Sequence, residues 1–93
     1  MTLSNARWHV ENNGDFVLDW VSLKNTGTNV LKDFTIGCDV RANSGTTLST
    51  LKTTVYETLY KGEVRGFTGF TLGKYPDQGA TVSCRVVNAR YVW

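Results

Sequence analysis

The sequence predicts an all-β protein, a sandwich or barrel of antiparallel strands. Apolar and polar residues alternate along most of the chain, which is the period of a half-buried strand. Turn residues interrupt this alternation at intervals of roughly ten residues, a spacing typical of all-β sandwiches and barrels rather than of β-α-β units. No segment has the apolar spacing of a good helix. The chain is therefore expected to consist of strands joined by turns.

The first two strands are expected to form a hairpin around Asn13-Gly14. Trp8 and Val10 lead into the turn, and a long strand follows from about Asp15 to Lys24. Asn and Gly tolerate positive φ, so this pair predicts a type I′ turn. The long strand has two apolar faces and is expected to be covered on both sides, or to meet a partner on one. These faces are Phe16, Leu18 and Trp20 on one side and Val17, Val21 and Leu23 on the other.

The third expected strand runs from Leu31 to Arg41, between a loop at 25–29 and a turn at 42–45. Its alternation is regular, so one of the two cysteines of the chain points the same way as three apolar side chains. The residues on that face are Phe34, Ile36, Cys38 and Val40.

The threonine-rich stretch 46–60 comes next. β-branched side chains favour strands over helices, so this stretch predicts two short strands with a kink near Ser49-Thr50. After a tight turn at 61–63, residues 64–73 are expected to form a strand. The glycines at 66 and 69 inside that strand suggest a bulge or close packing of Phe67 and Phe70 over the backbone.

The last expected strand follows a loop that contains Pro76 and continues toward the end of the chain. The alternation again assigns the side chains of this strand to two faces. Val82, Cys84 and Val86 lie on one face, and Arg85, Val87, Ala89 and Tyr91 lie on the other.

Length and composition fit a single domain over residues 1–93. A chain of 93 residues buries about two-thirds of its unfolded surface, enough for one core. The formal charge is +2, and the ten Lys and Arg residues are spread along the chain, whereas binding to phosphate backbones needs them clustered. Nucleic acid is therefore not an expected partner. No apolar stretch approaches the roughly 18 residues of a spanning helix, so this segment is not expected to insert into a membrane.

The two cysteines occupy matching positions, each in the middle of an apolar strand face. Two inward-facing cysteines of a sandwich can reach the short Cα separation that a disulfide requires. A Cys38–Cys84 bridge would close a loop of roughly 45 residues and stabilise the fold by about 4 kcal/mol in the chain-entropy description. Two reduced core cysteines remain the alternative. Neither a metal site nor a nucleophile is expected, because His9 is the only histidine and its spacing links it to neither sulfur.

Aromatic side chains are the candidate binding residues. Trp8, Trp20 and Tyr56 could form a platform for sugars or peptides, although aromatic residues on strands more often pack in cores and at edges. The acids show no pairing of the kind that a glycosidase or calcium site needs. Asp19, inside an apolar strand, is expected to meet a Lys or Arg or to lie at a bulge. No cofactor is expected, and an enzyme would require His9 beside an acid in an open cleft.

Three turn signals resemble those of the FxLYD-type domains of bacterial and archaeal exported or membrane-anchored proteins. The resemblance covers about residues 16–90, and this chain has Gly37-Cys38-Asp39 where the motif that names the family reads Leu-Tyr-Asp. It implies an immunoglobulin-like antiparallel β-sandwich of about seven strands, in agreement with the strands counted above, and no catalytic residues. The signals are Leu23-Lys24-Asn25, Cys38-Asp39-Val40 with Ser44-Gly45, and Leu59-Tyr60-Lys61-Gly62-Glu63 with Phe67.

These observations favour a non-catalytic, extracytoplasmic interaction or spacer module of a bacterial envelope protein. Its partner is expected to be a protein or another component of the cell envelope, and an exposed edge strand could make a homodimer. The alternative is a carbohydrate- or peptide-binding module that uses the aromatic face. An even cysteine count in a short chain favours export, periplasmic or secreted, and the domain could be anchored through a segment outside this sequence.

Overall fold

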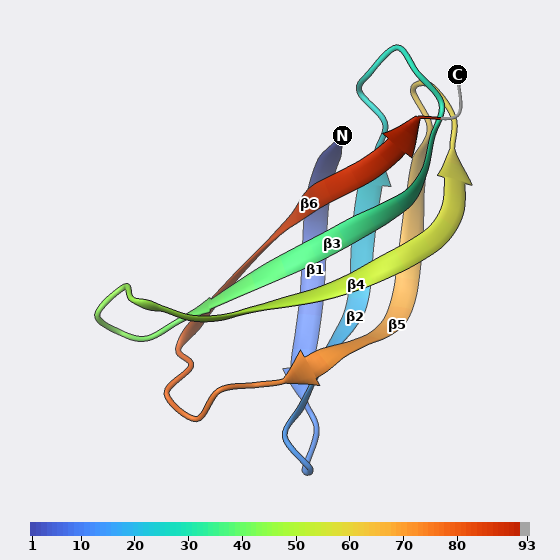
Figure 1. Ribbon diagram of the computed structural model, residues 1–93. Helices are drawn as coiled ribbons and strands as arrows, with labels where there is room; N and C mark the ends of the chain where they lie inside the picture. The colour runs from blue at the N-terminus through green and yellow to red at the C-terminus, as the bar shows by residue number, and fades with distance from the viewer. Residues whose placement is uncertain (92–93) are drawn as a thin grey trace.

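The computed structural model describes residues 1–91, which form a β-sandwich of two antiparallel sheets (Figure 1). One sheet, called sheet I here, has the strand order β1-β2-β5, and the other, sheet II, has the order β4-β3-β6. The predicted all-β sandwich is confirmed. The described residues contain six strands and no helix: β1 (Thr2–Val10), β2 (Asp15–Lys24), β3 (Leu31–Arg41), β4 (Thr47–Leu59), β5 (Val64–Lys74) and β6 (Thr81–Tyr91).

The core lies between the two sheets, where the inner faces of β2 and β3 meet. Both are the central strands of their sheets, and both have fully buried inward side chains. Phe34 of β3 and Phe67 of β5 pack edge to face with ring centroids 5.5 Å apart, an orientation that aromatic pairs prefer. The core residues are Phe16, Leu18, Val21, Leu23, Phe34, Ile36, Cys38, Val55, Leu59, Phe67 and Leu72.

The prediction of two apolar faces on β2 is wrong in one respect. Leu18 and Val21 both point into the core, so the alternation shifts by one residue between them, and Asp19 and Trp20 are both exposed. The shift coincides with irregularities in both neighbouring strands. The register with β1 shifts between Arg7 and Trp8, which lie opposite Trp20 and Leu18, and Gly69 of β5 has a φ of 76°. A strand at the centre of a sheet follows such bulges in its neighbours.

The hairpin between β1 and β2 is also different from the predicted type I′ turn. Only Gly14 has a positive φ, at 89°, and Asn13 does not. The backbone amide of Gly14 donates to the carbonyl of Glu11, and the amide of Glu11 donates to the carbonyl of Asp15. This is the longer loop in which a turn is followed by one left-handed glycine. β1 itself begins at Thr2, well before the expected Trp8.

Two further expectations are corrected by β4 and β6. β4 is one continuous strand of 13 residues and not two short strands separated near Ser49-Thr50, so the described residues have six strands rather than about seven. In β6 a register shift at Val87 turns Ala89 inward, where it packs against the core instead of facing outward.

The buried side chain of Asn25 closes one end of the sandwich. Its Nδ2 donates to the carbonyls of Asn29, at 2.8 Å, and Leu59, at 3.0 Å, and its Oδ1 accepts from the amide of Gly27. Its backbone exchanges hydrogen bonds with the β4–β5 turn, through Glu63 and Gly62. A buried amide is tolerated because each polar atom has a partner.

Candidate functional site

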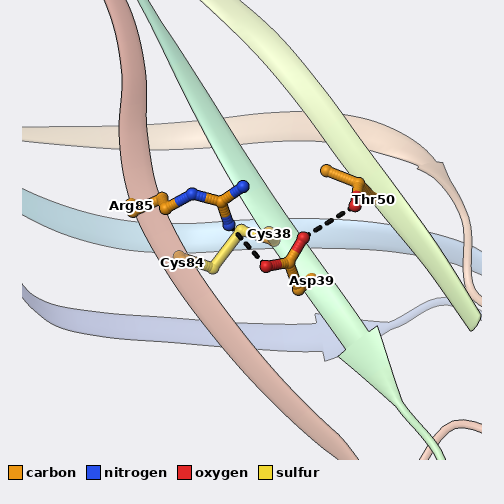
Figure 2. The surroundings of a disulfide bond; sticks show 5 residues. All are labelled: Cys38, Asp39, Thr50, Cys84 and Arg85. Atoms are coloured by element: carbon orange, nitrogen blue, oxygen red, sulfur yellow. Dashed lines mark hydrogen bonds and ion pairs between the residues drawn. A yellow bond between two sulfur atoms is a disulfide. The ribbon is translucent and has the colours of Figure 1, made fainter. Parts of the chain in front are cut away.

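Cys38 and Cys84 form a disulfide, as predicted (Figure 2). The bridge does not connect the two sheets. Cys38 of β3 lies directly opposite Cys84 of β6 in sheet II, with a Cα–Cα separation of 4.0 Å. Cys38 is fully buried and Cys84 is half-buried, both on the core side of the sheet. The sulfurs are therefore a structural cross-link between neighbouring strands.

An ionic cluster lies on the other face of sheet II, over the disulfide. Asp39 accepts hydrogen bonds from the Thr50 hydroxyl of β4, at 2.7 Å, and from the Arg85 guanidinium of β6, as Figure 2 shows. Arg41 lies 3.6 Å from the same carboxylate. The Thr50 hydrogen bond, helped by Arg85, holds the pKa of Asp39 below its ordinary value, although partial burial opposes this. The cluster thus connects all three strands of sheet II.

His9 lies within hydrogen-bond distance of two acids on the outer face of sheet I. Its Nδ1 is 2.8 Å from Asp19 and its Nε2 is 3.1 Å from Glu11. The Asp19 hydrogen bond, followed by that of Glu11, raises the pKa of His9. Asp19 therefore lies at an irregular point of β2, as expected, but its partner is a histidine rather than a Lys or Arg.

The setting of His9 is not a cleft. The imidazole is nearly half exposed on a strand face and lines neither of the two grooves described below. Both cysteines are in the disulfide, and among the described residues no Ser or Thr hydroxyl is hydrogen-bonded to His9. The side-chain partners of His9 among the described residues are therefore two carboxylates. No group of three His, Cys, Asp or Glu in residues 1–91 is arranged to hold a metal ion.

The three candidate aromatic residues lie on different surfaces. Trp8 is opposite the core residue Leu18 and stacks on Phe16 at 5.4 Å. Trp20 is on the outer face of sheet I, where its ring covers Gly66. Tyr56 belongs to sheet II and is 80% exposed. The structure therefore does not bring the three side chains together on one aromatic face.

Two grooves follow the two sides of the sandwich, where edge strands of different sheets face each other. One lies between β4 and β5, and Tyr56, Phe67 and Phe70 are among the residues that line it. The other, of about 460 Å³, lies at the side formed by β1 and β6 and is called the β6 groove here. Among its lining residues are Met1, Leu31, Val86 and Ala89.

The register of sheet II places basic residues near one another that the sequence pattern did not predict to be neighbours. Lys32 of β3 lies directly opposite Arg90 of β6, and Gly37 lies between Lys52 of β4 and Arg85 of β6. Opposed residues in antiparallel strands share a face, so these two pairs of cations lie on the outer face of sheet II, where Asp39 and Asp33 partner the two arginines. They are far apart in the chain, and only the strand order brings them near one another.

Comparison with family models, curated proteins and solved structures finds no match to this chain. The turn residues that carry the FxLYD resemblance have structural roles here. Asn25 closes the end of the sandwich, and Glu63 accepts a hydrogen bond from the backbone amide of Tyr60 at 2.9 Å. The resemblance itself stays a prediction.

Proposed function

We propose that this chain is a non-catalytic, extracytoplasmic interaction or spacer module of a bacterial envelope protein, with an immunoglobulin-like fold. The observation that carries the proposal is the use made of the reactive side chains. Both sulfurs form one cross-link, and His9 is held between two carboxylates on an open strand face. These groups stabilise strand contacts and do not converge on a space that a substrate could enter.

The strand order supports the immunoglobulin-like assignment. In that fold strands A, B and E form one sheet and strands C and F lie side by side in the other. Here β1-β2-β5 corresponds to A-B-E, and β3-β6 corresponds to C-F with β4 added beside β3. The immunoglobulin disulfide bridges the two sheets, whereas this one joins neighbouring strands, so the similarity lies in topology and not in the cross-link.

The disulfide supports the proposed compartment. Disulfides persist in oxidising compartments such as the periplasm and outside the cell, and are rare in reducing cytosol. No helix of the described residues has the length and apolarity to cross a membrane. The proposed partner is a protein or another envelope component.

The compartment is tested by blocking free thiols in intact parent cells, reducing the extract and labelling the thiols that reduction releases. We expect nearly all Cys38 and Cys84 to be labelled only after reduction. Two thiols that are free before reduction would contradict the extracytoplasmic assignment. Saturable turnover of any substrate by the purified domain would contradict the non-catalytic one.

A second candidate function is supported by one observation. The ring of Trp20 lies over Gly66 and remains 40% exposed, which is the arrangement of a stacking platform for a sugar or peptide. Titration of tryptophan fluorescence with a panel of glycans and peptides tests it. The double variant W8F/W93F leaves Trp20 as the one tryptophan of the sequence and so assigns the signal to it. No quenching across the panel would reject this function.

A further inference from the structure

Strand β6 is an edge strand whose inner face is incompletely covered. Among the described strands it is hydrogen-bonded to β3 alone. The edge strands β4 and β5 each bury two inward side chains almost completely, Val55 and Leu59 in β4 and Phe67 and Leu72 in β5. Every inward side chain of β6 between residues 81 and 90 remains half-buried. These side chains are Val82, Cys84, Val86 and Ala89.

The β6 groove lies beside this incompletely covered face. Val86 and Ala89 of β6, Leu31 of β3 and Met1, which precedes β1, give the groove its apolar surface. Thr28, Asn29 and Asn88 give it polar surface. A strand added next to β6 would direct every second side chain into this groove, because successive side chains of a strand point to opposite faces. The half-buried apolar side chains on the inner face of β6 therefore favour an occupant with apolar residues at alternate positions.

The outward side chains of β6 determine the charge of such an occupant. Arg85 and Arg90 lie on the outer face of sheet II and are more than half exposed. Arg85 is hydrogen-bonded to Asp39, Arg90 lies 3.7 Å from Asp33, and Lys32 lies opposite Arg90, so three cations stand against two acids here. A second copy of the chain paired through β6 would bring its own two arginines against these cations, and like charges across strands are destabilising. Acidic side chains would be attracted instead.

We propose that β6 accepts an additional strand from a partner protein, an extended segment in which apolar and acidic residues alternate. Its apolar side chains enter the β6 groove against Val86 and Ala89, and its acidic side chains meet Arg85 and Arg90. The backbone hydrogen bonds of the new ladder supply affinity, and the two sets of side chains supply selectivity. This inference rests on the proposed interaction role and names the surface and the chemistry of the partner.

The first experiment uses a fluorescein-labelled peptide of alternating valine and glutamate, about nine residues long, which spans about 30 Å when extended. We expect saturable binding by fluorescence anisotropy, weakened by salt, together with new protection from hydrogen exchange at the β6 amides. A peptide of alternating valine and lysine is the charge control. Equal binding of the two peptides, or no binding of either, would overturn the proposal.

Backbone pairing is tested on the peptide, which leaves the protein intact. Alternate amides of a strand point to opposite edges, so N-methylation of the valine amides blocks one edge of the peptide and N-methylation of the glutamate amides blocks the other. We expect one of the two methylated peptides to lose binding and the other to keep it. If both methylated peptides kept their binding, no ladder of backbone hydrogen bonds would form, and the added strand would be rejected.

Charge selectivity is tested with the double variant R85E/R90E. We expect its affinity for the valine-glutamate peptide to fall about tenfold or more, and its affinity for the valine-lysine peptide to rise. Lys61→Glu, in the β4–β5 turn, is the matched control and should change neither affinity. The circular dichroism spectrum verifies that the double variant folds, and the methylated peptides test the proposal independently of it.

Other occupants have distinct signatures. A dimer of the unmodified chain in sedimentation experiments, with protection of the β6 amides from hydrogen exchange, would assign the edge to a second copy. Binding of polyglutamate as strong as that of the alternating peptide would assign the face to polyanions. Either result overturns the proposed strand without affecting the compartment, which the thiol labelling tests separately.

Discussion

The two sheets of this protein have the same number of described strands and different means of holding them together. In sheet II the Cys38–Cys84 disulfide joins β3 to β6 on the inner face, and Asp39 joins all three strands on the outer face. In sheet I no covalent bond joins the described strands. Trp20 packs over Gly66, and His9 pairs with Asp19 across β1 and β2.

The difference shows that a three-stranded sheet can be stabilised either by specific cross-links or by packing on its outer face. A disulfide reduces the freedom of the unfolded chain, whereas the indole of Trp20 acts only in the folded state by covering backbone. The two sheets are therefore expected to respond differently to reduction, to a change in side-chain volume and to pH.

Removal of the disulfide should have the largest effect. The double variant C38A/C84A is expected to lose about 4 kcal/mol of unfolding free energy, because the bridge closes a loop of sequence separation 46. Urea denaturation followed by circular dichroism measures it, with Ser83→Ala on the same strand as the control. A loss below about 1 kcal/mol would mean that the strand contacts alone fix β6 to β3.

Asn25→Ala should rank second and should weaken both sheets, since Asn25 lies between the end of β2 and the end of β4. The change removes three side-chain hydrogen bonds and leaves the carbonyl of Leu59 buried without that partner, for a loss of about 3 kcal/mol. Asn43→Ala, at an exposed turn, is the control. If the variant showed faster amide hydrogen exchange in one sheet only, the role of Asn25 in linking the two sheets would be contradicted.

Gly66→Ala should affect sheet I alone. The new Cβ would lie 1.9 Å from the Trp20 ring, so the indole must move, with a loss of about 2 kcal/mol and a shift in tryptophan emission. Gly27→Ala is the matched control, because its Cβ meets nothing closer than 3.5 Å. An unchanged emission spectrum would show that Trp20 does not pack there.

Acid should weaken sheet II through Asp39. Its folded-state pKa is lowered below 3.8, mainly by the Thr50 hydrogen bond, so its stabilising contribution is present above pH 3.8 and is lost as the pH falls through the folded-state pKa. Asp39→Asn should therefore be less stable than the unchanged protein at pH 6, and the difference should vanish in strong acid. If the two proteins still differed in stability in strong acid, the loss in Asp39→Asn would come from altered geometry and not from the lost charge.

The smallest expected effect is a loss of stability in sheet I when His9 loses its proton at higher pH. Its pKa is raised above 6.5, mainly by Asp19, so its contribution is complete below pH 6.5 and is lost as the pH rises through the folded-state pKa. An NMR titration of the imidazole measures that pKa directly. Asp19→Asn should lower it, and an unchanged value would mean that the pair does not form in solution.

Sequence reasoning succeeds where the alternation of a strand is regular. Leu31–Arg41 was predicted with the bounds that the structure has, and the Cys38–Cys84 bridge was predicted from the apolar setting of both cysteines. It fails at irregular points such as Trp20 and Ala89, because a bulge depends on the neighbouring strand and on its register. The same limit hid the pairing of His9 with Asp19.

The position of the disulfide determines how the molecule would extend under mechanical load. A force that separates the first residues of β1 from the last residues of β6 can peel β1 and β2 away, but the segment between Cys38 and Cys84 cannot lengthen while the sulfurs remain joined. A spacer built in this way would have a limited maximum extension, and a reducing agent would release the remainder.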